Sequence, residues 1–228
     1  MYPNNIMEVF ASPKNLVKLL KRDLQFNQYC IEERLKKGDT LTLDTKNEFF
    51  YMLESGYLKE TYTDILNIQF HLIVKPPHFP IFATTEEEMP ESVSLTALTD
   101  VRWWKIDFQF FKKVLYSEDP RSYVVLHNLL FVKTRLYELV VKDRMEASDR
   151  IYYTLLQLLD ISLVAGKNRA EFPRFLDYTL LAELASTSRS YTVMLLGELR
   201  EKGILVTNKK PWKLEDIAAL QALLFKEK

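Results

Sequence analysis

The sequence predicts an α+β protein in which an antiparallel β-roll comes first and helices dominate the rest of the chain. Short runs of β-branched and aromatic residues fill residues 31–106. From residue 119 onwards, leucines and valines recur at helical spacing instead. With 228 residues, 47% of them hydrophobic, the chain is long enough for two domains.

A helical segment over residues 12–28 precedes the roll. Ser12 stands at the cap position and Pro13 in the first turn, which is typical of a helix start. Four leucines follow on one helical face: Leu16, Leu19, Leu20 and Leu24. We therefore expect one or two helices before the first strand.

Five runs predict the strands of the roll: residues 40–43, 49–53, 57–62, 68–74 and 93–106. Turn signals at residues 37–39, 55–56 and 76–77 separate several of these runs, which favours a small antiparallel barrel or roll. An acidic patch, expected to be a solvated loop, is formed by Glu86, Glu87, Glu88 and Glu91.

A long helix is predicted to start at Asp119-Pro120. Its apolar residues follow steps of four and three, the heptad spacing that keeps one seam facing a partner helix: Val125, Leu129, Val132, Leu136 and Leu139. We expect this seam to mediate dimerisation. The alternative is packing on the protein's own core, for which a second apolar face is available: Leu126, Leu130, Tyr137 and Val140.

A further helix is predicted over residues 147–164, and two short helices follow over 179–185 and 188–202. The small Ala182 allows the last two helices to cross closely, as in a helix-turn-helix. Ser186 stands in the turn where glycine is common. Residues 203–206 and 212–214 flank the basic turn 208–211 and predict a two-stranded wing.

The second helix of this pair carries the residues expected to read DNA. An arginine near a helix N-terminus can bond guanine in the major groove, and hydroxyls and lysines can bond phosphates. The base-reading candidates are Arg189, Ser190, Val193 and Met194, and the phosphate-binding candidates are Ser188, Tyr191, Lys209 and Lys210. Residues 167–213 hold nine basic and five acidic residues inside a chain with 31 of each, which favours local contact with double-stranded DNA.

This order of elements resembles the CRP/FNR family of bacterial transcription regulators. The resemblance rests on residues 181–185, Ser188-Arg189 and residues 195–205. It implies a roll of the cyclic-nucleotide-binding type with N-terminal helices over residues 1–116, a dimerisation helix over 117–145 and a winged helix-turn-helix over 146–228. It also implies a homodimer that binds a palindromic promoter site and acts on RNA polymerase.

The sequence departs from the cyclic-nucleotide-binding members of that family. Residues 79–84 and 89–94 contain neither the Gly-Glu nor the Arg-Ser pair that those members use, and Glu91 adds negative charge beside Ser92. We therefore predict no cyclic-nucleotide binding. A small ligand of another kind remains an alternative, held between the aromatic residues of the roll and the long helix near Tyr123 or His127: Phe49, Phe50, Tyr51, Tyr57, Tyr62 and Phe70. Such a stripe is more simply core.

No cofactor, metal or enzymatic activity is expected. One cysteine, Cys30, cannot hold an iron–sulfur cluster, and we interpret His71, His78 and His127 as structural or exposed rather than haem ligands. No nucleophile elbow, phosphate-binding loop or metal-ligand cluster is present. The lack of a signal-like segment or long apolar run predicts a cytoplasmic protein with no membrane partner. The alternative function is a β-roll regulatory subunit, or a small-ligand sensor, that acts through protein partners without reading DNA.

Overall fold

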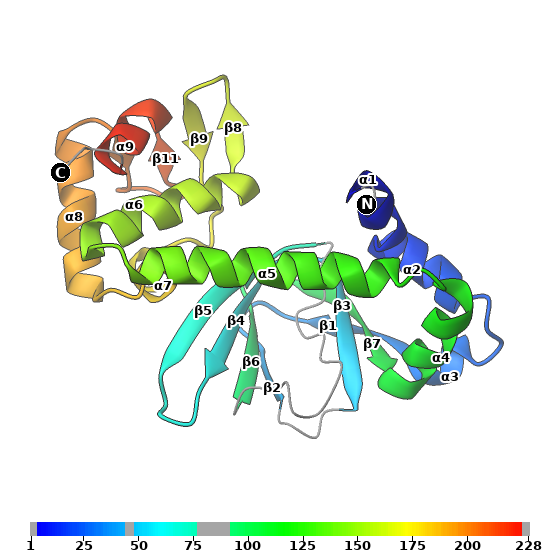
Figure 1. Cartoon of the computed structure of the whole chain (residues 1–228). Coiled ribbons are helices and arrows are strands. Elements are labelled where there is room, and N and C mark those ends of the chain that lie inside the picture. Colours follow the sequence, from blue (N-terminus) through cyan, green and yellow to red (C-terminus); the bar gives the residue numbers. More distant parts are fainter. Residues whose placement is uncertain (1–3, 44–47, 77–91, 225–228) are drawn as a thin grey trace. The chain divides into compact units, whose positions relative to one another are not determined.

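The computed structural model describes residues 4–43, 48–76 and 92–224 (Figure 1). It divides into two compact units, residues 1–136 and 137–228, and each is described by itself. Helix α5 (Tyr123–Asp143) runs from the first unit into the second. The α+β class predicted from the sequence is confirmed.

The first unit contains a roll of two antiparallel sheets. Three strands form the sheet β1-β7-β3 and four form the sheet β2-β6-β4-β5. The strands are β1 (Cys30–Leu35), β2 (Thr40–Leu43), β3 (Phe49–Ser55), β4 (Leu58–Thr63), β5 (Gln69–Val74), β6 (Ser92–Ala97) and β7 (Val101–Asp107). Leu53, Leu58 and Trp103 belong to the core cluster formed by residues from both sheets.

The run predicted over residues 93–106 is two strands rather than one. The chain turns between β6 and β7, where the Thr99 hydroxyl accepts a hydrogen bond from Tyr57 N at 3.0 Å. Gly56 lies against this turn at φ +91°, and a Cβ there would overlap the carbonyl oxygen of Asp100. Strand β1 pairs with β7 from Cys30↔Ile106 to Leu35↔Val101.

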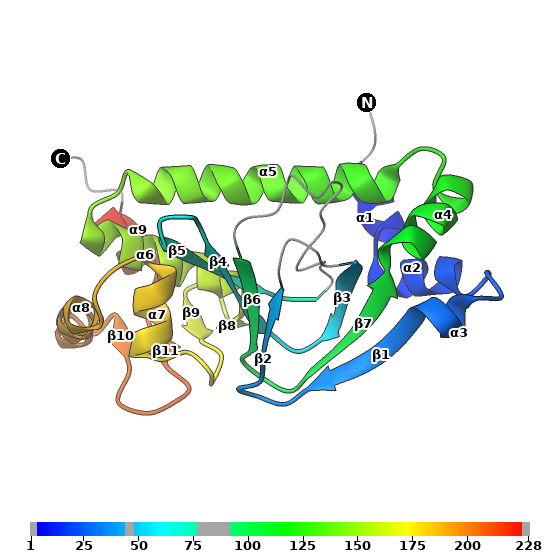
Figure 2. The same ribbon diagram turned by 90° about the horizontal axis from the view of Figure 1, so that it is seen from below.

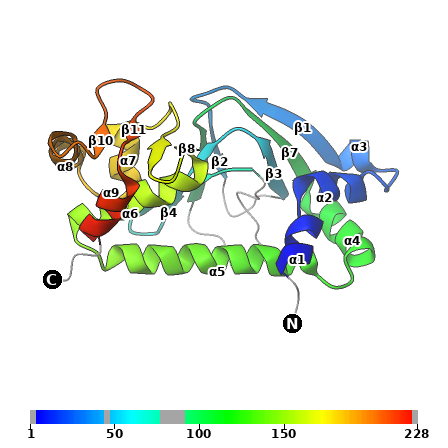
Figure 3. The same cartoon turned by 90° about the horizontal axis from the view of Figure 1, so that it is seen from above.

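Helices α2 (Pro13–Leu20) and α4 (Phe108–Glu118) pack on the outer face of the three-stranded sheet, and short helices α1 (Asn4–Phe10) and α3 (Phe26–Tyr29) adjoin them (Figures 2 and 3). The helix expected over residues 12–28 ends at Leu20, and Leu24 is fully exposed (102%). The chain turns there because the Asp23 carboxylate accepts a hydrogen bond from Gln25 N at 2.9 Å. The sequence pattern did not predict α1 or α4.

Helix α5 begins at Tyr123, three residues after the predicted Asp119-Pro120 start. The buried Asp119 carboxylate accepts hydrogen bonds from Tyr123 N and Val124 N, both at 2.9 Å, and thereby satisfies two backbone donors of the first turn. Val124 joins the core beneath α2 and α4. By contrast, Leu129, Val132 and Leu136 are 55%, 41% and 56% exposed in the single chain.

The second unit consists of helices around a small sheet in the order β10-β11-β9-β8. Its elements are α6 (Ala147–Gln157), the 3-10 helix η2 (Leu158–Ile161), β8 (Leu163–Ala165), β9 (Arg169–Glu171), α7 (Tyr178–Leu184), α8 (Arg189–Glu201), β10 (Leu205–Val206), β11 (Lys213–Leu214) and α9 (Ile217–Leu224). The helix predicted over 147–164 is α-helical to Gln157 and continues as the 3-10 helix η2 to Ile161, and the prediction was wrong beyond that residue. Residues 163–165 instead pair with β9 across a turn that contains Gly166 at φ +68°.

Candidate nucleic-acid interface

Helices α7 and α8 form the predicted helix-turn-helix. Each begins at a capping side chain: Asp177 accepts from Leu180 N at 2.9 Å, and Ser188 accepts from Tyr191 N at 3.1 Å. Ala182 is buried, so its small side chain is accommodated in the packing of α7. The leucines of both helices form the inner face: Leu180, Leu181, Leu184, Leu195, Leu196 and Leu199.

The turn between the helices is held by two basic side chains from outside it. Ser186 adopts φ +50°, the left-handed region in which glycine is common. The Arg150 guanidinium donates to the carbonyl oxygens of Ala185, Ser186 and Met145, each at 3.0 Å. Lys142 Nζ donates to the Leu184 carbonyl oxygen at 2.6 Å. The Leu184 and Ala185 carbonyls lie at the end of α7, where intrahelical donors are lacking and positive charge is favourable.

Lys142 is a buried cation, and its surroundings disfavour its charge. Burial lowers the pKa of Lys142, and the nearby Arg150 charge lowers it further, while Glu138 opposes the shift. Neither Lys142 nor Arg150 was predicted as part of the site. Both lie on helices that precede the helix-turn-helix, so the local sequence pattern carries no signal for their contacts.

The predicted base-reading residues lie in the N-terminal half of α8. Arg189 and Ser190 are exposed, Val193 is partly exposed, and Met194 is 52% exposed. Between them Thr192 is buried, where its hydroxyl lies 3.0 Å from the Thr187 hydroxyl. No described residue forms an ion pair with Arg189. Its guanidinium is therefore available to a ligand.

The phosphate-binding candidates differ in how free they are. The Ser188 hydroxyl oxygen is occupied as a cap acceptor, but its hydrogen remains to donate. Tyr191 is partly exposed and Lys209 is exposed. Lys210 Nζ lies 3.6 Å from the carboxylate of Asp177, so its charge is partly compensated. The exposed Lys213 on β11 is a wing cation that the sequence analysis did not select.

The wing is anchored by aromatic packing. Strands β10 and β11 pair at Leu205↔Leu214 and Val206↔Lys213. The ring centroids of Tyr178 and the buried Trp212 lie 4.8 Å apart. This contact connects the wing to the first turn of α7.

Among the other residues considered in the sequence, Cys30 belongs to the core and His71 contacts a neighbouring strand. Burial, with the Asp107 charge, raises the pKa of the Cys30 thiol to about 12, so the thiol is poorly reactive. His71 Nδ1 lies 2.9 Å from the Thr61 hydroxyl, and His127 is half-buried. His78, most of the region compared with the cyclic-nucleotide motifs, and all four glutamates of the acidic patch lie outside the described residues. Within the described ranges, no cluster of three or more metal-ligating side chains occurs.

The aromatic residues of the roll are divided between two core clusters, and Phe49 and Tyr62 pack against the same cluster as Tyr51. Phe50 belongs to the core beneath α2 and α4, whereas Tyr51 belongs to the core between the sheets. Tyr62 stacks on Phe70 with ring centroids 4.6 Å apart. The stripe is therefore divided between separate packing layers.

Among the described helices, none has the length and apolar character needed to cross a membrane.

Comparison with known proteins confirms the predicted resemblance to CRP/FNR regulators. No family model matches the chain. A curated relative, the HTH-type transcriptional regulator ArcR of Staphylococcus epidermidis, is 24% identical over 195 residues, which are 83% of this chain and 84% of the relative.

Solved structures of this fold align over most of the chain. A cyclic nucleotide-binding domain containing protein from Listeria monocytogenes EGD-e superposes with a TM-score of 0.73 at 20% identity, covering 89% of this chain and 96% of that one. A CooA variant from Carboxydothermus hydrogenoformans gives 0.69 at 18% identity, with 95% and 94% covered. A CRP/FNR family transcriptional regulator from Thermus thermophilus gives 0.64 at 16% identity, with 85% and 98% covered.

Proposed function

We propose that this protein is a DNA-binding transcription regulator of the CRP/FNR type. In this proposal it binds a palindromic promoter site as a homodimer, without control by cyclic nucleotide. The observation that carries the proposal is the exposed N-terminal end of α8, on which Arg189 has no ion-pair partner among the described residues. The ArcR relative and the Thermus thermophilus structure are transcriptional regulators by name, which supports the same interpretation.

The geometry of the second unit suits a major groove. The N-terminal residues of a recognition helix contact base edges, and Arg189 can donate two hydrogen bonds to a guanine. The backbone N–H groups at the start of α8 and the Ser188 hydroxyl lie at the same end of the helix, where a phosphate is favoured. Lys209 and Lys213 add positive charge on the wing.

Dimerisation is supported by the exposed heptad seam on α5. Leu129, Val132 and Leu136 are each more than 40% exposed in the single chain, and Val125 and Leu139 extend the same seam. Burial of such apolar residues against a second copy removes them from water. Two copies related by a twofold axis present two α8 helices, and a twofold protein favours a palindromic site.

Independence from cyclic nucleotide is supported by the sequence of the roll. Residues 79–94 lack the charged pairs that hold a ribose and a cyclic phosphate in the family. We further propose that the bound dimer acts on RNA polymerase, and that it works in the cytoplasm.

Selection from a random duplex pool with the purified full-length protein tests the proposal. We expect the selected sequences to share an inverted repeat, and the affinity to fall steeply with rising salt because phosphate contacts release counterions. Arg189→Ala should lose about 1–3 kcal/mol of binding free energy on the selected site and relax one base position in each half.

Arg200→Ala is the matched control, since Arg200 is exposed on the same helix but lies in its last turn. This variant should keep the base preference of the wild type. Equal affinity of Arg189→Ala and wild type would show that Arg189 does not read bases. Failure to select any duplex would favour a roll protein that acts through protein partners.

A further inference from the structure

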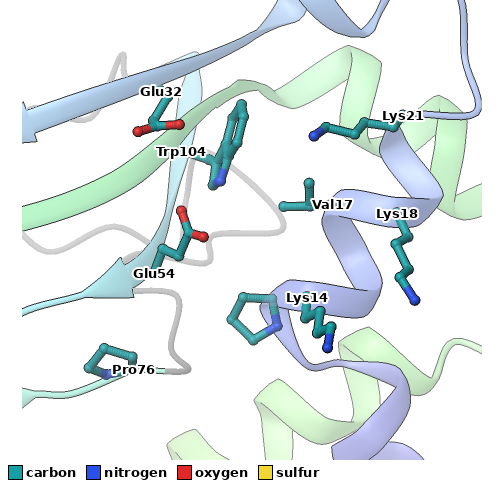
Figure 4. Close-up of a pocket in the computed structure, with 9 residues that line it drawn as sticks. Lys14, Val17, Lys18, Lys21, Glu32, Glu54, Pro76 and Trp104 are labelled. Carbon is teal, nitrogen blue, oxygen red and sulfur yellow. The ribbon is translucent and has the colours of Figure 1, made fainter.

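A second site lies in the first unit, on the outer face of the three-stranded sheet. A cavity of about 710 Å³ opens between α2 and the strands β1, β3 and β7. Such a volume accommodates a small organic molecule. The side chains that matter are the α2 lysines Lys14 and Lys18 with Lys21 at the end of the helix, the strand carboxylates Glu32 and Glu54, and Trp104 of β7 (Figure 4).

The charges around this cavity do not cancel. Glu54 lies 3.2 Å from the Arg102 guanidinium, and Glu32 lies 3.7 Å from that of Arg34, so each carboxylate has a cation of its own. None of the three lysines forms an ion pair with a described residue. Counted over the described residues, the lining therefore carries an excess of positive charge that an anion would neutralise.

Trp104 supplies an apolar wall and an unused donor. Its side chain is partly exposed, and Lys21 Nζ lies 5.8 Å from the ring centroid. Figure 4 shows the ring between the two carboxylates and the residues Val17 and Lys21. The indole Nε1 is buried and has no acceptor among the described residues, which is uncommon for a polar atom. Lys21 is a flexible side chain, so a ligand can displace it to reach the ring.

We propose that this cavity binds a small organic anion, a carboxylate or phosphate ester with a flat apolar body. The anionic group lies among Lys14, Lys18 and Lys21, and the apolar body lies on Trp104. The cavity is outside the roll, because the space between the two sheets is filled by core residues such as Leu53, Leu58 and Trp103.

Titration of the full-length protein with phenyl phosphate, phenylacetate, phenol and inorganic phosphate tests this site, with calorimetry and tryptophan fluorescence as readouts. We expect both aromatic anions to bind, phenol not to bind, and inorganic phosphate to bind roughly tenfold more weakly than phenyl phosphate, because it lacks the apolar body. Trp104→Phe should remove the fluorescence response, since it keeps an aromatic ring but loses the indole.

Lysine variants locate the anion. Lys14→Gln, Lys18→Gln and Lys21→Gln should each weaken phenyl phosphate binding roughly fivefold, because each removes one charged contact. The matched control Lys112→Gln changes an exposed lysine of α4 whose ammonium lies over the Phe108 ring instead. It should bind as the wild type does. Absence of binding by both aromatic anions, equal loss in Lys112→Gln, or an unchanged response in Trp104→Phe would each overturn the proposal.

Circular dichroism and thermal unfolding show whether each variant is folded before it is titrated. The site is defined by binding to residues of the first unit, so its failure leaves the DNA-binding proposal untouched. Likewise, if no DNA duplex is selected from the random pool, the cavity can still be tested by titration with the aromatic anions.

Discussion

A buried carboxylate in the roll makes the stability of the first unit depend on pH. Glu60 of β4 is 2% exposed, and its Oε1 has no hydrogen-bond partner among the described residues. Burial raises the pKa of Glu60 to about 8, against an ordinary value of 4.5, while a hydrogen bond with Tyr62 and the charge of Arg135 lower it less strongly. At a pH between 4.5 and 8, Glu60 therefore keeps a proton in the folded protein that it has lost in the unfolded chain.

The direction and size of the effect follow from this difference in bound protons. The contribution of Glu60 to the free energy of unfolding is greatest below about pH 4.5. This contribution is lost as the pH rises towards 8. The free energy of unfolding falls by at most about 1.4 kcal/mol for each pH unit. Between pH 4.5 and pH 8 the loss amounts to roughly 5 kcal/mol. A loss of that size is comparable to the total stability of a small domain.

Glu60→Gln removes the titrating group and keeps its shape. We propose to measure the free energy of unfolding in urea between pH 5.5 and 8.5 for both proteins in a Trp212→Phe background. Fluorescence then reports on Trp103 and Trp104 of the first unit. The variant should become progressively more stable than the parent as the pH rises.

Glu48→Gln is the control for this measurement, because it changes an exposed carboxylate just before β3. Its effect on stability should stay within about 0.5 kcal/mol, as for most surface substitutions. A free-energy difference between Glu60→Gln and its parent that does not change with pH would refute the reasoning, since no proton would then be taken up on folding.

Three further predictions concern the DNA-binding apparatus and its control. Arg150→Ala should destabilise the second unit by about 3 kcal/mol in urea unfolding, because three carbonyl oxygens lose a charged donor. The control Arg174→Ala, at an exposed position, should change the free energy of unfolding by less than about 0.5 kcal/mol. Equal effects of the two substitutions would argue against the turn contacts. Leu129→Glu combined with Leu136→Glu should give a monomer in sedimentation velocity with an unchanged circular dichroism spectrum, because carboxylates would have to be buried at the α5 seam; a persisting dimer would place the interface elsewhere. Cyclic AMP should give no heat of binding in calorimetry, and tight binding would contradict the interpretation of residues 79–94.

Much of the candidate interface could be predicted because it is encoded locally. The two helices of the helix-turn-helix were placed within one residue of α7 and α8, since their apolar spacing lies in one short stretch. Local patterns gave a wrong secondary structure where a short apolar run is compatible with either a helix or a strand. Leu163 and Val164 continue a helical pattern, yet they form a strand because a partner, β9, is within reach.

The sequence by itself therefore determined the α+β fold class, the order of the main elements and the helix end that presents Arg189. Only the tertiary structure decided which distant groups meet: Arg150 at the turn, Lys210 with Asp177, and Trp104 with the lysines of the cavity. It also decided that Glu60 is buried, although its neighbours in the chain are ordinary strand residues. Periodicity reports which side of an element faces inward, whereas ion pairs, cavities and desolvation depend on atoms brought together from separate parts of the chain.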